Sequence, residues 1–380
     1  MMSCVIKQHF RVFVLCVIGI TLVACNASDT TNSNGGEAAT ADTPHSYAGE
    51  TVTVVIGLDA SAGGTTVGRL LAKHLEENLE GNPTVIVNNM PGASTLNAHL
   101  HVLLRAPKDG TTVYYGPRSS LGELLEFPGF TFKYSQFTPL GGVQIAALVV
   151  YARTDSLTGG YTQPSELVAS EDLLFGGMPP EHGRMIISTM GLDLMNMKYK
   201  YIGGYPSSGN IRASMISGEV NAATDAAHAY LNQVVPVLVE QGDALPVFSL
   251  PVMNAQGELV QNALVPDIPS LPDLYQTLNG EAPSGVLWDS IATMVELDQT
   301  MQHVFLGPPG MDAAAAETFR SGLEKAMATA SFAEEGQQIL SYVPEHVGYQ
   351  RQAEILSATE SVTPEVLEYI KGHIEKNSGY

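Results

Sequence analysis

Cysteine is scarce in this chain and absent beyond its first 25 residues. The three cysteines are Cys4, Cys16 and Cys25. A disulfide framework, or a zinc site of the cysteine type, needs several thiols in the folded part of a protein. The remaining 355 or so residues therefore carry neither.

Basic residues are also few. The sequence has 18 Lys and Arg against 39 Asp and Glu, a formal net charge of -21, and no Lys/Arg cluster. Such a surface repels nucleic acid and anionic membranes. It opposes anionic solutes at long range too, so an anion site must work through local dipoles and one or two arginines that are screened from the bulk field.

Long apolar runs are missing as well. An apolar run from Phe13 to Ala24 follows Lys7 and Arg11, but it has only about a dozen residues, whereas a spanning helix needs about 20. This pattern predicts a signal peptide over residues 1–24, with a short anchor helix as the alternative. Removal of Lys7 and Arg11 changes the formal charge from -21 to -23.

The residues after this run indicate a tethered, secreted protein. Leu22-Val23-Ala24-Cys25 resembles the bacterial lipobox, which implies lipid modification of Cys25 and cleavage just before it. Residues 25–48 are rich in Ser, Thr, Asn and Gly, cannot form a core, and are predicted to be a flexible tether. We expect a periplasmic or cell-surface domain that is anchored to a membrane by lipid.

Motifs of common enzyme classes are missing. Gly63 to Arg69 has the outline of a P-loop, but Arg69-Leu70 stands where Lys-Ser/Thr is required, and no G-x-G-x-x-G or G-x-S-x-G is present. His99 and His101 are two residues apart, about 200° around a helix, which does not make a common metal site. The sequence therefore predicts no enzyme activity, no cofactor and no metal.

Strand and helix patterns alternate along the rest of the chain, which favours an α/β fold with mostly parallel sheets. About 330 residues exceed one typical domain, so we expect two lobes, 49–145 plus 245–380 and 146–244. Strands are predicted at 51–56, 84–87, 111–115, 146–151, 173–176, 198–202, 220–223 and 245–250. Helices are predicted at 65–79, 94–105, 164–169, 181–190, 210–217, 312–330, 332–340 and 364–375.

Three strand-to-helix turns are rich in small residues: 61–66, 91–95 and 176–178. Glycine lets a ligand approach the backbone, and a helix start presents unpaired N–H donors with a partial positive charge. One such turn is most often only a turn. Three at the carboxyl ends of parallel strands predict a carboxylate or phosphate site.

Four side chains near these turns are candidate ligands. Arg118 and Arg184 have the geometry for bidentate binding of a carboxylate, with surface salt bridges as the alternative. Asp225 follows a predicted strand and either accepts a ligand hydroxyl or amine or caps the next helix. His182 lies at a predicted helix start, where a ligand role is the less favoured interpretation.

Five stretches in order resemble the extracytoplasmic solute receptors of tripartite tricarboxylate transporters, the Bug proteins. They are similar to family motifs at P-G-G-x-x-D, N-R-P-G-A-G, A-P-D-G-Y-T-L, P-Y-K-G and P-D-V-P-T, and they stand here at 62–72, 88–94, 106–113, 204–221 and 266–273. The resemblance implies a two-lobed periplasmic binding protein of the type II kind, each lobe a mixed sheet flanked by helices. The ligand cleft lies between the lobes, and the chain is a monomer that serves membrane transporter subunits.

Combined with the turns, the resemblance predicts these ligand-binding residues: Ala62, Gly63, Gly64, Thr65, Thr66, Pro91, Gly92, Ala93, Ser94, Arg118, Ser119, Gly177, Met178, Arg184, Tyr205 and Asp225. The chain departs from the family at 177–184, where the serine of the helix start is lost and an arginine is added. Asn221 and Val67 also replace family aspartates. We therefore expect a different distal half of the pocket.

The predicted mechanism is capture of a small organic acid, with its carboxylate on the amides of the first two turns and the second lobe closing over its distal group. Two alternatives stay open. One is a ligand-sensing lipoprotein that feeds a signalling partner, and the other is a secreted α/β hydrolase.

Overall fold

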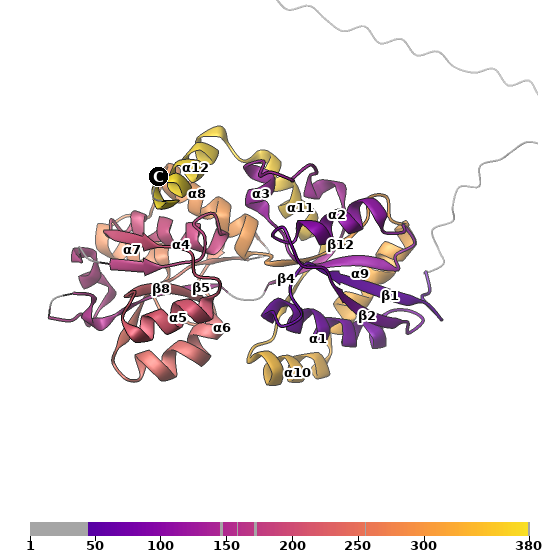
Figure 1. The fold of residues 1–380 in the computed structure, drawn as a ribbon, viewed down its shortest axis with the longest axis horizontal. Helices are drawn as coiled ribbons and strands as arrows, with labels where there is room; N and C mark the ends of the chain where they lie inside the picture. The colour runs from indigo at the N-terminus through magenta and orange to yellow at the C-terminus, as the bar shows by residue number, and fades with distance from the viewer. Residues whose placement is uncertain (1–44, 145–146, 158, 171–172, 255, 379–380) are drawn as a thin grey trace, which may run out of the picture. The chain divides into compact units, whose positions relative to one another are not determined.

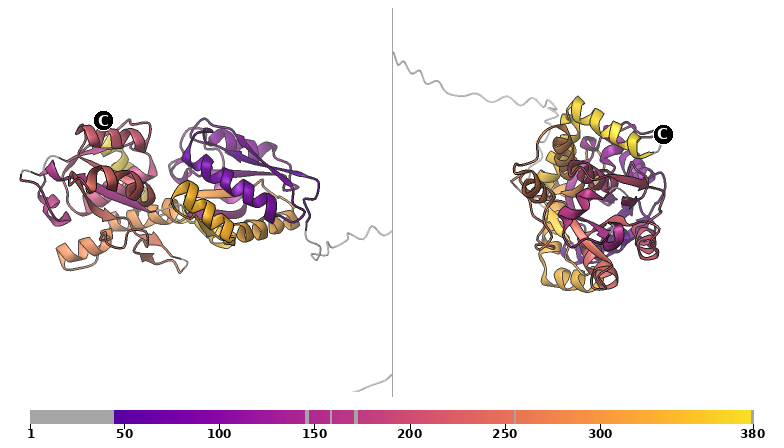
Figure 2. Two further views of the ribbon diagram at one scale, coloured as in Figure 1. Left: turned by 90° about the horizontal axis from the view of Figure 1, so that it is seen from below. Right: turned by 90° about the vertical axis from the view of Figure 1, so that its left-hand side faces the viewer.

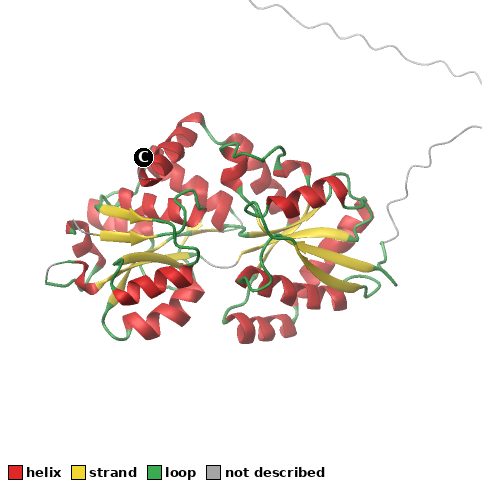
Figure 3. Cartoon of the chain, in the orientation of Figure 1, coloured by secondary structure: helices red, strands yellow, loops and turns green. Residues whose placement is uncertain are grey.

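The computed structural model describes residues 45–378 except 145–146, 158, 171–172 and 255. The predicted signal peptide, the lipidated Cys25 and nearly all of the predicted tether lie outside the described residues. Within them, no helix has the length and apolar character needed to cross a membrane. The strands fall into two groups with helices beside each (Figure 3), which confirms the α/β class.

The first sheet has six strands in the order β13-β4-β12-β3-β1-β2. Its strands are β1 Thr51–Ile56, β2 Thr84–Asn89, β3 Thr112–Pro117, β4 Thr138–Gln144, β12 His303–Gly307 and β13 Glu345–Val347. β1 pairs in parallel with β2 and β3, and Ile56 is level with both Asn89 and Tyr115. The turns that follow these three strands therefore leave the sheet at one edge.

Helices cover both faces of the first sheet (Figure 1). They are α1 Gly63–Asn78, α2 Leu96–Arg105, α9 Ala313–Ala328, α10 Ala330–Leu340 and α11 Tyr349–Ala358, with short α3 Ser120–Leu124 and 3-10 helix η1 Tyr134–Gln136. Leu71 and Leu75 of α1 are fully buried in a core with Tyr115 and Phe319. The helical spacing of these leucines is the signal that predicted α1.

The second sheet has five strands in the order β7-β6-β8-β5-β9. They are β5 Leu148–Arg153, β6 Leu173–Gly176, β7 Tyr199–Ile202, β8 Ala222–Ala226 and β9 Ala244–Ser249. β6, β7 and β8 are parallel, so the ends of these three strands also share one edge. A small antiparallel hairpin, β10 Val252–Met253 and β11 Leu259–Val260, follows.

The second core is formed by helices from distant parts of the chain. They are α4 Gly183–Leu194, α5 Ser208–Ser217, α6 Ala227–Ala229, α7 Leu271–Asn279, α8 Val286–Met294 and α12 Pro364–Ser378, with π-helices η4 Tyr230–Val239 and η5 Val295–Gln299 and 3-10 helices η2 Thr154–Ser156, η3 Pro164–Ala169 and η6 Thr359–Ser361. Although α12 ends the described chain, it packs against α8 and α4, and Figure 2 shows the C-terminus among the elements around the second sheet.

Two features differ from the sequence prediction. Both sheets are mixed, as the family resemblance implies and in contrast to the mostly parallel sheets that the alternation of strands and helices favours, because β12 enters antiparallel between β3 and β4, and β5 runs antiparallel to β8. β9 also pairs with β5 of the second sheet. The chain therefore stays with the second sheet beyond residue 245, where the sequence analysis has it return to the first lobe.

Candidate functional site

The turns after β1 and β2 are tied together by polar contacts. The Asn89 amide donates to the Leu58 carbonyl at 2.8 Å and to Thr65 Oγ1 at 3.2 Å. Thr65 Oγ1 in turn donates to the Asp59 carbonyl at 2.7 Å. These bonds hold the start of α1 next to the end of β2, so two of the predicted ligand turns lie side by side.

The start of α1 has free backbone donors. Its N-cap residue, Ala62, makes no side-chain cap. The amides of Thr65 and Thr66 bond to the Ala62 carbonyl. The amides of Gly63 and Gly64 bond to no acceptor within the described part of the chain. An anion is the natural partner for such donors.

Gly64 is where a side chain would not fit. A Cβ there would meet Leu58 and His303 at 2.5 and 2.7 Å, whereas a Cβ on Gly63 would meet nothing within 4 Å. His303 begins β12, and Tyr115 Oη lies 2.9 Å from its Nδ1. Burial, with a contribution from Arg184, lowers the pKa of His303 to about 3, so the imidazole is neutral at pH 7.

The turn after β2 is an array of left-handed residues. Gly92, Ala93, Ser94 and Thr95 have φ values of 121°, 48°, 51° and 75°. The amides of these four residues have no acceptor among the residues that the structure describes. Pro91 to Ser94 are exposed, so this turn offers backbone donors to solvent or to a ligand.

At the end of β3, Arg118 and Ser119 have structural partners. Arg118 is 7% exposed, and its Nη2 donates to the Leu297 carbonyl of η5. Its Nε and Nη1 are buried without a described partner. Ser119 accepts from the Gly122 amide at 3.1 Å and so caps α3. Burial lowers the pKa of Arg118, and nearby Asp298 opposes this shift.

The second-sheet turn after β6 is closed by its own contacts. Tyr201 donates to the Met178 carbonyl, and a Cβ on Gly177 would overlap the Tyr201 ring. The Gly177 amide bonds to the Ile202 carbonyl at 2.9 Å. Tyr205 is half-buried, and its hydroxyl has no partner in the described chain. Tyr205 is thus the member of this group with a free donor.

The start of α4 carries the two predicted basic side chains. His182 is the N-cap, and its Nδ1 accepts from the Arg184 amide at 3.4 Å. Burial, and then the charge of Arg184, lowers the pKa of His182 to about 4. Arg184 is half-buried, and its guanidinium makes no hydrogen bond or ion pair to any described residue. Its surface-salt-bridge alternative is therefore not what the structure shows.

Asp225, at the end of β8, is occupied by protein groups. Arg212 lies 2.7 Å from its Oδ1, and Tyr151 donates to its Oδ2 at 3.1 Å. The N-cap of α6 is Ala226, which makes no side-chain cap, so the helix-capping alternative for Asp225 is wrong. Burial raises the pKa of Asp225 to about 6, against the effect of Arg212.

Four residues that sequence reasoning missed join the site. Asp298 on η5 accepts from Ser120 Oγ, and His303 packs on Gly64. His228, which follows Asp225 in the chain, packs against the ring of Tyr342 in a tilted arrangement with ring centroids 4.3 Å apart. Tyr342 follows α10, a helix beside the first sheet, whereas His228 follows β8 of the second sheet. The contact therefore joins residues from around the two sheets. No local pattern marks these residues, because each is brought in by long-range packing.

One constellation has the outline of a hydrolytic triad. Thr189 Oγ1 lies 2.7 Å from His373 Nε2, and His373 Nδ1 lies 3.2 Å from Asp193. Thr189 is only 1% exposed, and its hydroxyl also donates to the Met185 carbonyl at 2.7 Å. A substrate does not reach it, and the contacts fasten α12 to α4. Among the described residues, no group of acids, His and Cys is placed to hold a metal.

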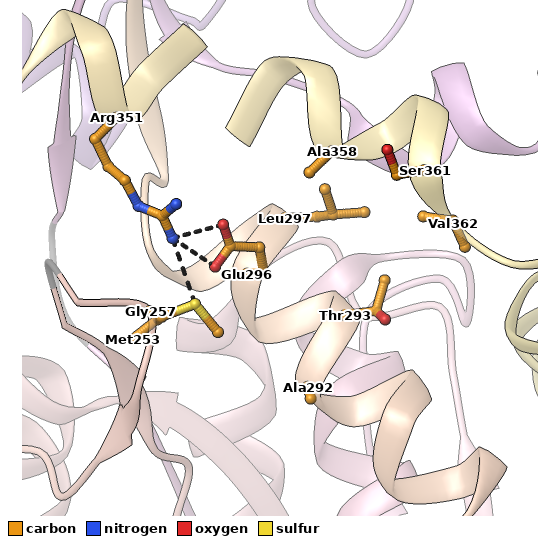
Figure 4. Close-up of a pocket in the computed structure, with 10 residues that line it drawn as sticks. All are labelled: Met253, Gly257, Ala292, Thr293, Glu296, Leu297, Arg351, Ala358, Ser361 and Val362. Carbon is orange, nitrogen blue, oxygen red and sulfur yellow. Dashed lines mark hydrogen bonds and ion pairs between the residues drawn. The ribbon is translucent and has the colours of Figure 1, made fainter. Parts of the chain in front are cut away.

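Two pockets lie away from the turns after β1 and β2, although the second includes Glu181 of the turn before α4. One of about 400 Å³ is lined by Met253, Glu296, Leu297 and Arg351 among others (Figure 4), and one of about 470 Å³ by Phe127, Glu181 and Lys371 among others. In the first, Arg351 Nη2 lies 2.6 and 2.7 Å from the two Glu296 oxygens. Neither is lined by the turns after β1 and β2, where the free backbone donors lie.

Comparison with solved structures shows the fold to be that of the solute-binding proteins of the TctC and Bug type. A TctC solute-binding protein from Polaromonas superposes with a TM-score of 0.61 at 14% identity, over 87% of this chain and 100% of its own. The periplasmic binding protein BugD gives 0.56 at 16%, over 85% and 97%.

The adipate-bound R. palustris protein Rpa4515 gives a TM-score of 0.56 at 16% identity, over 87% of this chain and 97% of its own. No protein-family model and no curated protein sequence matches the chain. The predicted type of fold, two mixed sheets with flanking helices, is confirmed. These neighbours are binding proteins by their descriptions, and at such identities the likeness establishes the fold.

Proposed function

We propose that the protein is an extracytoplasmic solute receptor that captures a small carboxylate and is not an enzyme. The observation that carries this proposal is the set of unbonded amides at Gly63, Gly64 and residues 92–95, which lie together at one sheet edge. Backbone donors of this kind, at a helix start, suit a carboxylate oxygen. The fold shared with the adipate-bound protein supports the same ligand class.

In this proposal the ligand docks on the first-sheet turns, and the second lobe closes on its distal group through Met178, Arg184 and Tyr205. Binding then shifts an open-to-closed equilibrium. The lobes are those built on the two sheets. Of the remaining predicted residues, Arg118, Ser119, Gly177 and Asp225 shape the cleft through their contacts with protein groups.

The sequence supports a membrane-anchored location for the protein and delivery of the ligand to a transporter. Leu22-Val23-Ala24-Cys25 supports lipid attachment, and the acidic chain without basic patches supports a free domain outside the membrane. The partner would be the membrane subunits of a transporter of the tripartite tricarboxylate type. Mass spectrometry of Cys25 in membrane extracts tests the anchor, and a deletion of the membrane subunits tests uptake.

The binding claim is tested by a thermal shift screen of residues 26–380 against mono-, di- and tricarboxylates, aromatic acids and acidic amino acids. A ligand at 100 times its dissociation constant adds about 2.7 kcal/mol to the free energy of unfolding. A clear shift with one acid and none with the matching uncharged amide is expected. A shift with the amide alone would overturn the carboxylate proposal.

A further inference from the structure

The π-helix η5 links the two lobes. Its first residue, Val295, is fully buried in the core around the second sheet, and soon after η5 ends His303 begins β12 of the first sheet. The three residues after Val295 each bond to a side chain of the first lobe: Glu296 to Arg351, the Leu297 carbonyl to Arg118, and Asp298 to Ser120. A segment that starts in the second core is therefore fastened to the first lobe at three successive residues.

Arg351 belongs to the first lobe. It lies on α11, which packs on β4 and places Ile355 in a core with Tyr114 of β3. Its Nη2 lies 2.6 and 2.7 Å from the two Glu296 oxygens and 3.4 Å from Sδ of Met253 in β10. β10 follows β9 of the second sheet along the chain. One guanidinium of the first lobe therefore contacts both η5 and the hairpin that follows the second sheet (Figure 4).

The three fastenings of η5 differ in their exposure to solvent. Arg118 and Ser120 are 7% and 1% exposed, whereas the side chains of Arg351 and Glu296 are 23% and 18% exposed and line the pocket of about 400 Å³. Removal of one partner from a fully buried polar contact leaves the other group unpaired inside the protein. The pair of Arg351 and Glu296 is thus the fastening that a substitution can release while the core stays packed.

The lobes also meet at His228 and Tyr342, whose ring centroids are 4.3 Å apart. His228 follows β8 of the second sheet, and Tyr342 follows α10 beside the first sheet. Two-lobed binding proteins open and close about a few linking residues. A bond at the linking segment therefore biases the equilibrium between the arrangement in which these rings touch and one in which the lobes have separated.

We infer that Arg351 is a positioning residue for ligand capture, and that its ion pair with Glu296 holds the lobes in the arrangement in which His228 meets Tyr342. This inference rests on the proposed function. Neither member of the pair lies in a predicted ligand turn, so its effect on affinity comes through the fraction of molecules whose lobes are placed to bind. The dissociation constant rises in proportion as that fraction falls.

The test is the distance between the lobes of the ligand-free protein, measured by double electron–electron resonance. The mature chain with Cys25→Ser has no cysteine, so Glu77→Cys on α1 and Ile216→Cys on α5, both at exposed positions, take one spin label each. Arg351→Gln should change the mean distance and broaden its distribution. Glu296→Gln should do the same from the other side of the pair, and Arg351→Lys should keep most of the wild-type distribution because the charge stays.

Lys73→Gln is the matched control. It removes the same charge from an ion pair of the same length, 2.6 Å between Lys73 Nζ and Glu335, but both partners are on helices of the first lobe, α1 and α10. Its distance distribution should stay that of the wild type. Denaturant unfolding of each variant separates the two roles of Arg351. A lower stability of Arg351→Gln with an unchanged distance would show a merely structural pair and overturn the inference.

Ligand affinity gives the second readout, by titration with the acids of the thermal shift screen, adipate first. Arg351→Gln should raise the dissociation constant by up to about tenfold, and Lys73→Gln should leave it unchanged. If the distance shifted while the affinity stayed the same, the role of Arg351 in capture would be wrong and the receptor role would stand. If no acid bound the wild type, the proposed function itself would fall, and a shifted distance would still assign the pair to holding the lobes.

Discussion

The two sheets present the same topology to the candidate site but offer different chemistry. The turns of the first sheet, residues 57–63 and 90–95, end in free backbone amides and small side chains. The turn of the second sheet, residues 177–183, is bonded to Tyr201 and covered by Asp298, and offers the side chain of Arg184. The difference shows that a parallel strand edge supplies a location for a site, and local contacts decide what binds there.

The largest effect on ligand binding is expected from filling the first-sheet turn. Gly64→Ala places a Cβ against Leu58 and His303, which must shift and disturb the α1 start. We expect ligand affinity to fall by roughly 10- to 100-fold, because one hydrogen bond to a charged group contributes about 1.5–3 kcal/mol. Gly63→Ala is the control, because its Cβ meets nothing, and affinity by titration should change little. Equal losses of ligand affinity in both variants would show that Gly64 is not part of the binding site.

Acid should lower the free energy of unfolding, because protonation of His99 would place a charge in the core beside the first sheet. This residue is fully buried among Tyr114, Phe132 and Tyr134, and burial lowers its pKa to about 3. The folded pKa is below the unfolded value of about 6.5. Its contribution is therefore complete above pH 6.5 and is lost as the pH falls toward 3, by about 1.4 kcal/mol per pH unit.

Denaturant unfolding at a series of pH values checks this expectation. His99→Phe should be less stable at pH 7, because the bond from His99 Nδ1 to the Thr95 carbonyl at 3.0 Å is lost. Its stability should nevertheless fall less steeply below pH 6.5. An unchanged slope would contradict the assignment of acid sensitivity to His99.

Asp225 should give the second core the opposite pH dependence. Burial raises its pKa to about 6, above the unfolded value of about 3.9. Its stabilising contribution is therefore complete below pH 3.9 and is lost as the pH rises through 6, a change on the order of 2 to 3 kcal/mol. Asp225→Asn should flatten this slope in the same titrations. If the slope of stability against pH stayed the same as in the wild type, another titrating group would be responsible for it.

The smallest effect is expected from the contact between α4 and α12. Thr189→Val removes the hydroxyl that lies 2.7 Å from His373 Nε2. The free energy of unfolding should fall by about 1 kcal/mol, with ligand affinity unchanged, because this contact is remote from the first-sheet turns. Loss of a hydrolytic activity in Thr189→Val would instead revive the hydrolase alternative.

Local patterns predicted the elements that carry the first-sheet turns. β1 was predicted at its observed bounds, because Thr51 to Ile56 is β-branched and bounded by glycine. β12 was missed, because a five-residue, mostly apolar stretch does not reveal that it will enter antiparallel between two strands from a much earlier part of the chain. β9 was assigned to the wrong sheet for the same reason.

For the site, backbone features were easier to predict than side-chain roles. Glycines at 63, 64 and 92 mark turns wherever they occur. The partner of Arg118 is a carbonyl 179 residues away, and no local signal pairs them. Asp298 stands in Glu296-Leu297-Asp298, which has the composition of a solvated helix face, and only the packing of η5 against Gly183 gives it a role.

The π-helix η5 joins two regions of the molecule that have different surroundings. Glu296 lies in the surface pocket with Arg351 (Figure 4), while Asp298 lies at the candidate cleft. Residues two apart on a helix point in roughly opposite directions. One short helix therefore carries both the acid that meets the start of α4 and the acid that pairs with Arg351 in the surface pocket.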